Sequence, residues 1–136
     1  MLAQLPPEVR RMLEAPNFAS LATVRADGSP HVTPMWVDLD TDHLLMNTAE
    51  GRVKLAHVRR DPRVAVCVFD AERPYSWAEV LGKVVELRHE GAVGDINRLS
   101  RKYLGWDYPL PEGMVRVTMI IEPEDVRFAI REAPGR

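Results

Sequence analysis

Short apolar runs, each bounded by turn-forming residues, recur along this chain and constrain its fold more than any other feature. The clearest pair, 18–25 and 31–39, flanks Ala26-Asp27-Gly28-Ser29. An Asp-Gly pair supplies the positive φ angles of tight hairpin turns, so these two runs are predicted to pair as antiparallel strands. Pro34 has no N–H to donate to a ladder, so the second run belongs at an edge, a bulge or a strand end.

The rest of the chain continues this pattern. Further strands are predicted at 43–47, 63–70, 75–88, 114–122 and 125–130, and helices at 8–14, 50–60 and 93–104. Asp38-Leu39-Asp40-Thr41-Asp42 is predicted to be a polar turn, and Gly82 a bulge within its strand. Six or seven short, mostly hairpin-linked strands favour a β-barrel or sandwich. A dinucleotide-binding fold is disfavoured, because no glycine-rich fingerprint follows the first strand.

Length and composition point to one domain spanning 1–136. The chain has 136 residues and a net charge of −2, so the molecule as a whole does not attract nucleic acid and any basic site is local. The single cysteine, Cys67, lies in an apolar run and is predicted to be buried. No secretory signal opens the sequence and no apolar run approaches the length of a membrane span. We therefore expect a cytoplasmic protein.

The segment 47–64 is the best candidate for a binding site. A strand ends at Asn47-Thr48, and two cations, Arg52 and Lys54, then open a helix. Free N–H groups and the helix dipole make such a junction suited to an anion. The alternative is a solvated helix face on which Glu50 and Lys54 form an i,i+4 ion pair.

Other chemistry finds little support in the sequence. Asp38, Asp40 and Asp42 lack the later residues of a calcium loop, and the four histidines show no metal-ligand spacing, so no metal site is predicted. No catalytic dyad is recognisable, and the catalytic residues are left unassigned. His31 could be a base or an ordinary residue at a strand start. Trp36 and Tyr75 could pack normally or form a wall for a planar ring.

Four segments together resemble the pyridoxamine 5′-phosphate oxidase-like split-barrel superfamily. They are Ser20-Leu21-Ala22-Thr23-Val24, then 27–37, then Asn47-Thr48-Ala49 with Arg52 and Lys54, and finally Arg60-Asp61-Pro62-Arg63-Val64. Within the superfamily, the likeness is greater to the deazaflavin-dependent reductases that use coenzyme F-420. Pyridoxamine phosphate oxidases proper carry an arginine motif near the C-terminus that has no counterpart here, which disfavours vitamin B6 oxidation.

The resemblance implies a homodimer of six-stranded antiparallel split barrels with cofactor sites at the dimer interface. It places Pro34-Met35-Trp36-Val37 beside a flavin-like ring. Asn47, Thr48, Arg52 and Lys54 would hold the phosphate of the ribityl chain. Arg59 or Arg60 would meet the polyglutamate tail of F-420. The full set of predicted cofactor-binding residues is Pro34, Met35, Trp36, Val37, Asn47, Thr48, Arg52, Lys54, Arg60, Tyr75 and Ser76.

The function that the resemblance implies is hydride transfer between reduced F-420 and an electrophilic small molecule. Three alternatives stay open at this point. An FMN-dependent reductase or oxidase would use the same groove, since both cofactors present a tricyclic ring and a ribityl phosphate. A non-catalytic protein could store or shield a flavin, a deazaflavin or a haem-like ligand. A nucleic-acid binder could use the basic residues Arg52, Lys54, Arg59, Arg60 and Arg63, although the net negative charge disfavours it.

Overall fold

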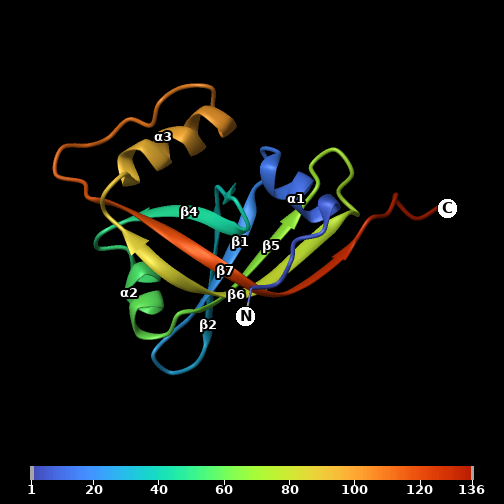
Figure 1. The fold of residues 1–136 in the computed structure, drawn as a ribbon, viewed down its shortest axis with the longest axis horizontal. Coiled ribbons are helices and arrows are strands. Elements are labelled where there is room, and N and C mark those ends of the chain that lie inside the picture. The colour runs from blue at the N-terminus through green and yellow to red at the C-terminus, as the bar shows by residue number, and fades with distance from the viewer. Residues whose placement is uncertain (1, 136) are drawn as a thin grey trace.

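The fold is a single antiparallel sheet with three short helices (Figure 1), seen in a computed structural model that describes residues 2–135. The strand order is β2-β1-β5-β6-β7-β4-β3. The strands are β1 Ala19–Val24, β2 Pro30–Met35, β3 Asp38–Asp40, β4 His43–Ala49, β5 Arg63–Phe69, β6 Trp77–Arg88 and β7 Arg116–Ala129. The helices are α1 Pro7–Glu14, α2 Val53–Arg60 and α3 Ala92–Tyr103. The mainly β, antiparallel architecture is therefore confirmed.

The β1–β2 hairpin forms as its turn residues predict. Gly28 has a φ of 88°, and the Asp27 carboxylate accepts hydrogen bonds from both the backbone N–H and the hydroxyl of Ser29. β2 is an edge strand of the sheet. Pro34 lies in this strand opposite Ser20, in agreement with the edge, bulge or strand-end position expected for a proline.

Two strand predictions were wrong. Residues 38–40 are not part of a turn but form β3, which pairs with β4, and this short strand makes seven strands instead of six. Residues 114–122 and 125–130 do not form two strands, because β7 runs continuously through Pro123. A register shift at Leu81/Gly82 leaves Glu124 of β7 as an extra residue beside the proline. A second shift, at Val84/Glu86, leaves Val85 of β6 as an extra residue, and the bulge predicted near Gly82 is confirmed.

Gly82 makes that bulge possible through the close approach of two backbones. A Cβ at this position would lie 2.1 Å from the carbonyl oxygen of Glu122. Only glycine allows β6 and β7 to pair this closely at the irregularity.

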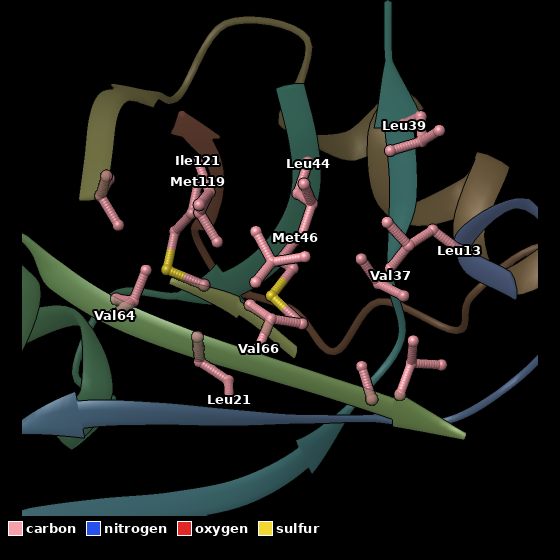
Figure 2. Packing of buried hydrophobic residues seen from close by; sticks show 14 of the residues in the cluster. Leu13, Leu21, Val37, Leu39, Leu44, Met46, Val64, Val66, Met119 and Ile121 are labelled. Atoms are coloured by element: carbon pink, nitrogen blue, oxygen red, sulfur yellow. The ribbon is translucent and has the colours of Figure 1, made fainter. Parts of the chain in front are cut away.

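The main core lies inside the curved sheet and is closed at one end by α1. Figure 2 shows Leu44 and Met46 of β4 and Met119 of β7 pointing toward Leu21 of β1 and Val66 of β5. All five side chains are at most 1% exposed. Replacing a leucine of this kind by alanine typically costs about 2–5 kcal/mol.

A second, smaller core lies on the other face of β4 and β7, beneath α3. Leu45 and Ile120 pack there against Ile96 and Leu99 of the helix. These two strands are thus buried on both faces, which explains why their apolar residues run consecutively instead of alternating. α3 is thereby fixed over the β4–β7 part of the sheet (Figure 1).

The outer face of β1, β2, β5 and β6 remains uncovered in one chain. Cys67 is exposed on this face, so the prediction that it is buried was wrong. Its neighbours on β5, Val66 and Val68, are buried, because successive side chains of a strand point to opposite faces. By the strand register, Val32, Ala22, Ala65 and Leu81 form one row across the outer face. Val32 is 64% exposed and Leu81 37% exposed.

The helices of this fold are short. Within residues 2–135, none has the length and apolar character needed to cross a membrane.

Candidate functional site

A cleft of about 270 Å³ opens where the end of β2, the end of β4, the start of α2 and the region around α3 meet. It is lined by Phe18, Pro34, Met35, Trp36, Asn47, Thr48, Ala49, Arg52, Lys54, Ile96, Leu99, Tyr108 and Arg116. Seven of the eleven predicted cofactor-binding residues lie in this lining: Pro34, Met35, Trp36, Asn47, Thr48, Arg52 and Lys54. Segments far apart in the sequence are thus brought together.

The other four predicted residues lie elsewhere in the chain. Val37 is fully buried in the main core. Arg60 lies on the outer side of α2 and donates a hydrogen bond to the carbonyl of Val24. Tyr75 is exposed in the loop before β6, and Ser76 exchanges hydrogen bonds with the backbone of Arg131. That these four residues contact a cofactor stays a prediction.

One wall of the cleft is aromatic and is held from behind. The Trp36 ring stacks on Tyr103, with centroids 5.4 Å apart and an interplanar angle of 9°, and meets the edge of Tyr108 at 6.1 Å. Tyr103 in turn contacts Phe18 at a centroid distance of 5.6 Å. An indole supported in this way presents a flat, apolar surface to the cleft.

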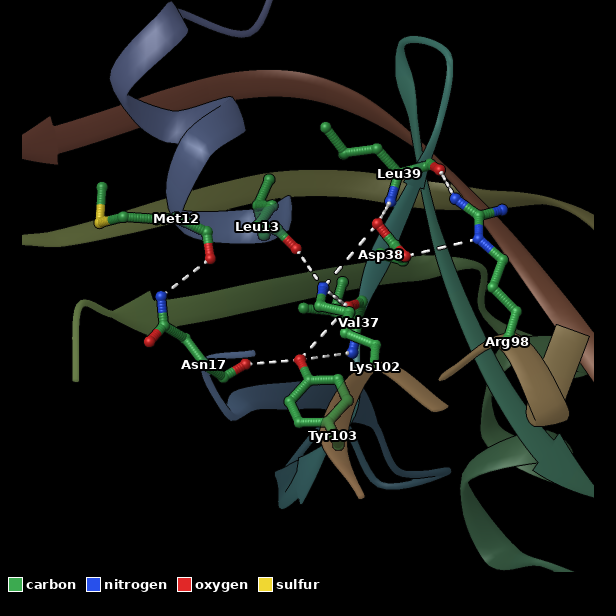
Figure 3. Close-up of polar contacts among 9 residues, drawn as sticks. All are labelled: Met12, Leu13, Asn17, Val37, Asp38, Leu39, Arg98, Lys102 and Tyr103. Carbon is green, nitrogen blue, oxygen red and sulfur yellow. Dashed lines mark hydrogen bonds and ion pairs between the residues drawn. The ribbon is translucent and has the colours of Figure 1, made fainter. Parts of the chain in front are cut away.

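The support behind Trp36 is a fully partnered polar cluster (Figure 3). The Tyr103 hydroxyl donates to the carbonyl of Asn17 at 2.6 Å and accepts from the N–H of Val37 at 3.1 Å. Burial raises the pKa of Tyr103 to about 12, so the hydroxyl keeps the proton that it donates. The tyrosine therefore ties α3 to the segment that follows β2.

A half-buried lysine reinforces the same junction. The Lys102 ammonium donates to the carbonyls of Leu13 and Val37, at 2.7 and 2.6 Å, and lies 3.8 Å from Asp38 (Figure 3). Arg98 lies on the other side of this carboxylate, at 3.4 Å. We call these four side chains, Asp38, Arg98, Lys102 and Tyr103, the rear cluster. They join α1, α3 and β3 behind the aromatic wall.

The opposite end of the cleft is cationic and lacks acidic partners. Arg52 is exposed at the N-cap of α2, Lys54 is half-buried in the first turn, and Arg116 on β7 is only 7% exposed. Within residues 2–135, no carboxylate lies within ion-pair distance of any of the three. We call Arg52, Lys54 and Arg116 the cation triad.

The ion pair between Glu50 and Lys54, considered above as the alternative to an anion site, does not form. Both carboxylate oxygens of Glu50 instead accept hydrogen bonds from Arg59, at 2.7 and 2.8 Å, and one lies 2.6 Å from His89. The bond from Arg59, then that from His89, lowers the pKa of Glu50 to about 2. Lys54 is left without this neighbour. Burial, then the charges of Arg52 and Arg116, lowers the pKa of Lys54.

Arg116 is the member of the triad that sequence reasoning missed. Its Nε donates to the Asn47 side-chain oxygen at 2.9 Å, and its guanidinium lies 5.1 Å from the centre of the Tyr108 ring. A lone arginine among apolar residues of a strand was the available signal. Its significance depends on β7 lying beside β4, where Arg116 is opposite Ala49.

Asn47 has its side-chain hydrogen-bonding groups occupied within the protein. Its amide nitrogen donates to the carbonyl of Ala92 at 3.0 Å and to the Thr118 hydroxyl at 3.1 Å. The Thr118 hydroxyl in turn donates to Asp95 at 2.7 Å. A buried amide with both donors engaged is suited to orienting Arg116.

Two further arginines of 47–64 are paired with carboxylates, and Arg60 lies outside the cleft, on the outer side of α2. Arg59 pairs with Glu50 and Arg63 pairs with Asp61, each at 2.7 Å. The local charge available to a ligand therefore comes from the cation triad in the cleft.

His31, considered above as a base, lies outside the cleft. Its ring meets the edge of His57 at 5.1 Å, and His57 Nδ1 lies 2.8 Å from the Thr23 hydroxyl. Within residues 2–135, no group of three or more histidine, cysteine or acidic side chains could hold a metal ion.

Comparison with known proteins shows which family the chain belongs to. The family model described as pyridoxamine 5′-phosphate oxidase matches residues 5–129. The chain belongs to this family. The resemblance noted in the sequence is thereby confirmed, and with it the split-barrel fold.

Solved structures agree with this membership. An F-420 reductase is 29% identical, with 90% of this chain and 98% of that chain covered and a TM-score of 0.81. An FAD-binding protein from Mesorhizobium loti is 25% identical, with 96% and 99% covered and a TM-score of 0.68. A conserved hypothetical protein from Mycobacterium tuberculosis shares the fold at 20% identity, with 99% and 94% covered and a TM-score of 0.75. No curated protein matches the chain.

Proposed function

We propose that this protein is an F-420-dependent oxidoreductase that transfers a hydride between reduced deazaflavin and an electrophilic small molecule. The cofactor ring would lie against the Trp36 side of the cleft, and its phosphate would lie at Arg52 and Lys54. The observation that supports this most strongly is that an apolar, aromatic wall and an acid-free group of cations line the same cleft. That combination matches a cofactor with a flat ring at one end and a phosphate at the other.

The position of the cations at the start of α2 adds to the proposal. Cations near the N-terminus of a helix are disfavoured by its dipole, typically by about 0.3–1 kcal/mol each. Burial, then repulsion from Arg52 and Arg116, lowers the pKa of Lys54, so both effects add to that penalty. A bound phosphate would relieve both effects, which gives the protein a reason to retain cations at these positions.

Reduced F-420 would supply the hydride, so the protein needs no catalytic dyad of its own. The chain's residues would bind the cofactor, orient its ring and shield it from water. Trp36, fixed by Tyr103, sets the plane of the ring. Ile96 and Leu99 exclude water from the apolar end, while the cations fix the anionic end. No side chain is assigned as a proton donor.

Two copies of the chain are part of the proposal. The cleft of about 270 Å³ is small beside the 300–1,000 Å³ usual for a site that encloses a cofactor-sized ligand, so a second wall is needed. The uncovered row on the outer face, with Val32 64% exposed, offers a surface for a second copy. The exposed Tyr75 would then contact the cofactor of the partner, with the buried Ser76 holding the loop beneath it.

The direct test is titration of the purified protein with F-420 and, separately, with FMN, followed by fluorescence quenching. We expect micromolar F-420 binding and oxidation of reduced F-420 by an enone or quinone acceptor. Micromolar FMN binding without F-420 binding would overturn the choice of cofactor. Tight binding without turnover across a broad panel of acceptors would favour a storage protein.

FMN remains the second candidate cofactor. It presents the same two recognition elements to the cleft, and one similar structure is named as an FAD-binding protein. A protein that is yellow as purified, with bound FMN identified by mass spectrometry, would support this alternative.

A further inference from the structure

Arg116 carries a buried charge that no acidic group in the described part of the chain neutralises. Its side chain is 7% exposed, and its nearest polar neighbours are the Asn47 amide at 2.9 Å, the Met114 sulfur at 3.3 Å and the ring of Tyr108. All of these groups are neutral. A buried cation without an anion is destabilising, since desolvation is not repaid by an ion pair.

Two other partly buried cations of the same molecule do have carboxylate partners. Lys102 has Asp38 at 3.8 Å and two carbonyl acceptors. Arg88 likewise has Asp95 at 3.5 Å and Asp40 at 3.9 Å. Arg116 differs from these cations because no carboxylate of residues 2–135 pairs with it, while it lines the cleft from which an anion could enter.

The guanidinium is also held in one orientation. Asn47 accepts from Nε, and the chain of hydrogen bonds continues through Thr118 to Asp95. The guanidinium carbon also lies over the Tyr108 ring, 5.1 Å from its centre. With Nε on Asn47 and one Nη1 donor on the Met114 sulfur, the Nη2 end of the fork remains for a ligand in the cleft.

We infer that Arg116 is the principal phosphate-binding residue of the cleft and that Asn47 acts through it as a positioning residue. This rests on the proposed function in that the phosphate belongs to a tricyclic cofactor. It changes the ranking of the residues: Arg116, being desolvated and fixed, contributes more to phosphate binding than the exposed Arg52. It also assigns Asn47 a role other than direct phosphate contact.

The test compares FMN with riboflavin, which has the same ring but no phosphate, in wild type, Arg116→Met and Arg52→Met. The measured quantity is the ratio of the two affinities. We expect Arg116→Met to lower that ratio by about 30-fold or more, and Arg52→Met by about ten-fold or less. Arg98→Met, on α3 outside the cleft lining, is the matched control and should leave the ratio unchanged.

An unchanged ratio in Arg116→Met, or equal weakening of FMN and riboflavin, would overturn the inference. If Arg116→Met does not fold, Arg116→Lys carries the test, because it retains the charge but lacks the fork, and the ratio should still fall. The positioning role of Asn47 predicts that Asn47→Ala lowers the ratio in wild type but has little further effect in Arg116→Lys. Additive losses would contradict it.

Failure of the proposed function is distinguishable from failure of this inference. If wild type binds neither FMN nor F-420, the proposed function fails. Inorganic pyrophosphate then serves as the probe: it should raise the melting temperature of wild type and of Arg98→Met, but not of Arg116→Met or Arg116→Lys. The same rise in all four proteins would overturn the inference without reference to any cofactor.

Discussion

The rear cluster lies behind the aromatic wall of the cleft and the cation triad lines its other end, and the charges of the two groups are partnered differently. In the rear cluster, Lys102 and Arg98 share the Asp38 carboxylate, and Lys102 also has two carbonyl acceptors. In the triad, three cations line one end of the cleft, and no carboxylate of residues 2–135 lies within ion-pair distance of them. Satisfied groups stabilise a fold, whereas unsatisfied charges lower its stability until a ligand binds. The contrast predicts that the rear cluster serves folding and the triad serves binding.

The largest effect on stability is expected from Lys102→Met. The substitution leaves the carbonyls of Leu13 and Val37 without their donor, so the free energy of unfolding should fall by about 2–4 kcal/mol in urea denaturation. Lys83→Met is the control, because Lys83 is an exposed lysine 3.6 Å from Glu124 and should change stability by less than about 1 kcal/mol. Equal effects of the two substitutions would remove the distinction between the two regions.

Lys54→Ala, in contrast to Lys102→Met, should weaken cofactor binding without lowering stability. Loss of a charge-assisted phosphate contact should weaken binding of F-420 or FMN by about ten-fold or more. The melting temperature of the ligand-free protein should stay the same or rise, since Lys54 repels Arg52 and Arg116. Fluorescence titration and thermal unfolding measure the two quantities on one sample. Unchanged affinity would show that Lys54 is only a helix residue that meets solvent.

Tyr103→Phe tests how far the rear cluster also controls the cleft. The stacking surface beneath Trp36 is kept, but the hydrogen bonds to Asn17 and Val37 are lost, so stability should fall by about 1–2 kcal/mol. Cofactor affinity should change by less than about three-fold, because the ring plane of Trp36 is set by stacking. A larger loss of affinity than of stability would assign the tyrosine to binding.

The smallest effect concerns pH and lies outside both regions. Burial, then the charges of His31, Arg60 and Arg25, lowers the pKa of His57 below 6.5. The unfolded chain therefore takes up a proton at this group before the folded chain does, and stability should fall as the pH drops from about 7.5 to about 5.5. His57→Gln should flatten this part of the profile, whereas His43→Gln should leave it unchanged. A profile with the same slope in His57→Gln would contradict the assignment.

The sequence predicted local structure well where the chemistry is local. The Asp27-Gly28 turn, the edge position of Pro34 and the bulge at Gly82 each follow from one or two residues. Pro123 misled the strand prediction because β7 continues through the proline by means of a bulge at the neighbouring Glu124. Cys67 misled the burial prediction because its run of apolar residues does not say which face of the sheet is covered.

The site could be predicted only in part for the same reason. Trp36, Asn47, Arg52 and Lys54 were found because they lie near strand and helix ends, where ligands commonly bind. Arg116 could not be found in this way, since its role depends on β7 pairing with β4 and on Asn47 being engaged elsewhere. Likewise, only the folded chain shows that Glu50 pairs with Arg59 and so leaves Lys54 available.

The most direct measurement titrates wild-type protein with F-420 and with the same deazaflavin lacking its phosphate, at low salt. A ring held by the aromatic wall and a phosphate held by the cation triad predict micromolar binding of F-420 and at least about ten-fold weaker binding of the phosphate-free compound. Equal affinity for the two compounds would contradict the assignment of the cation triad as the phosphate site.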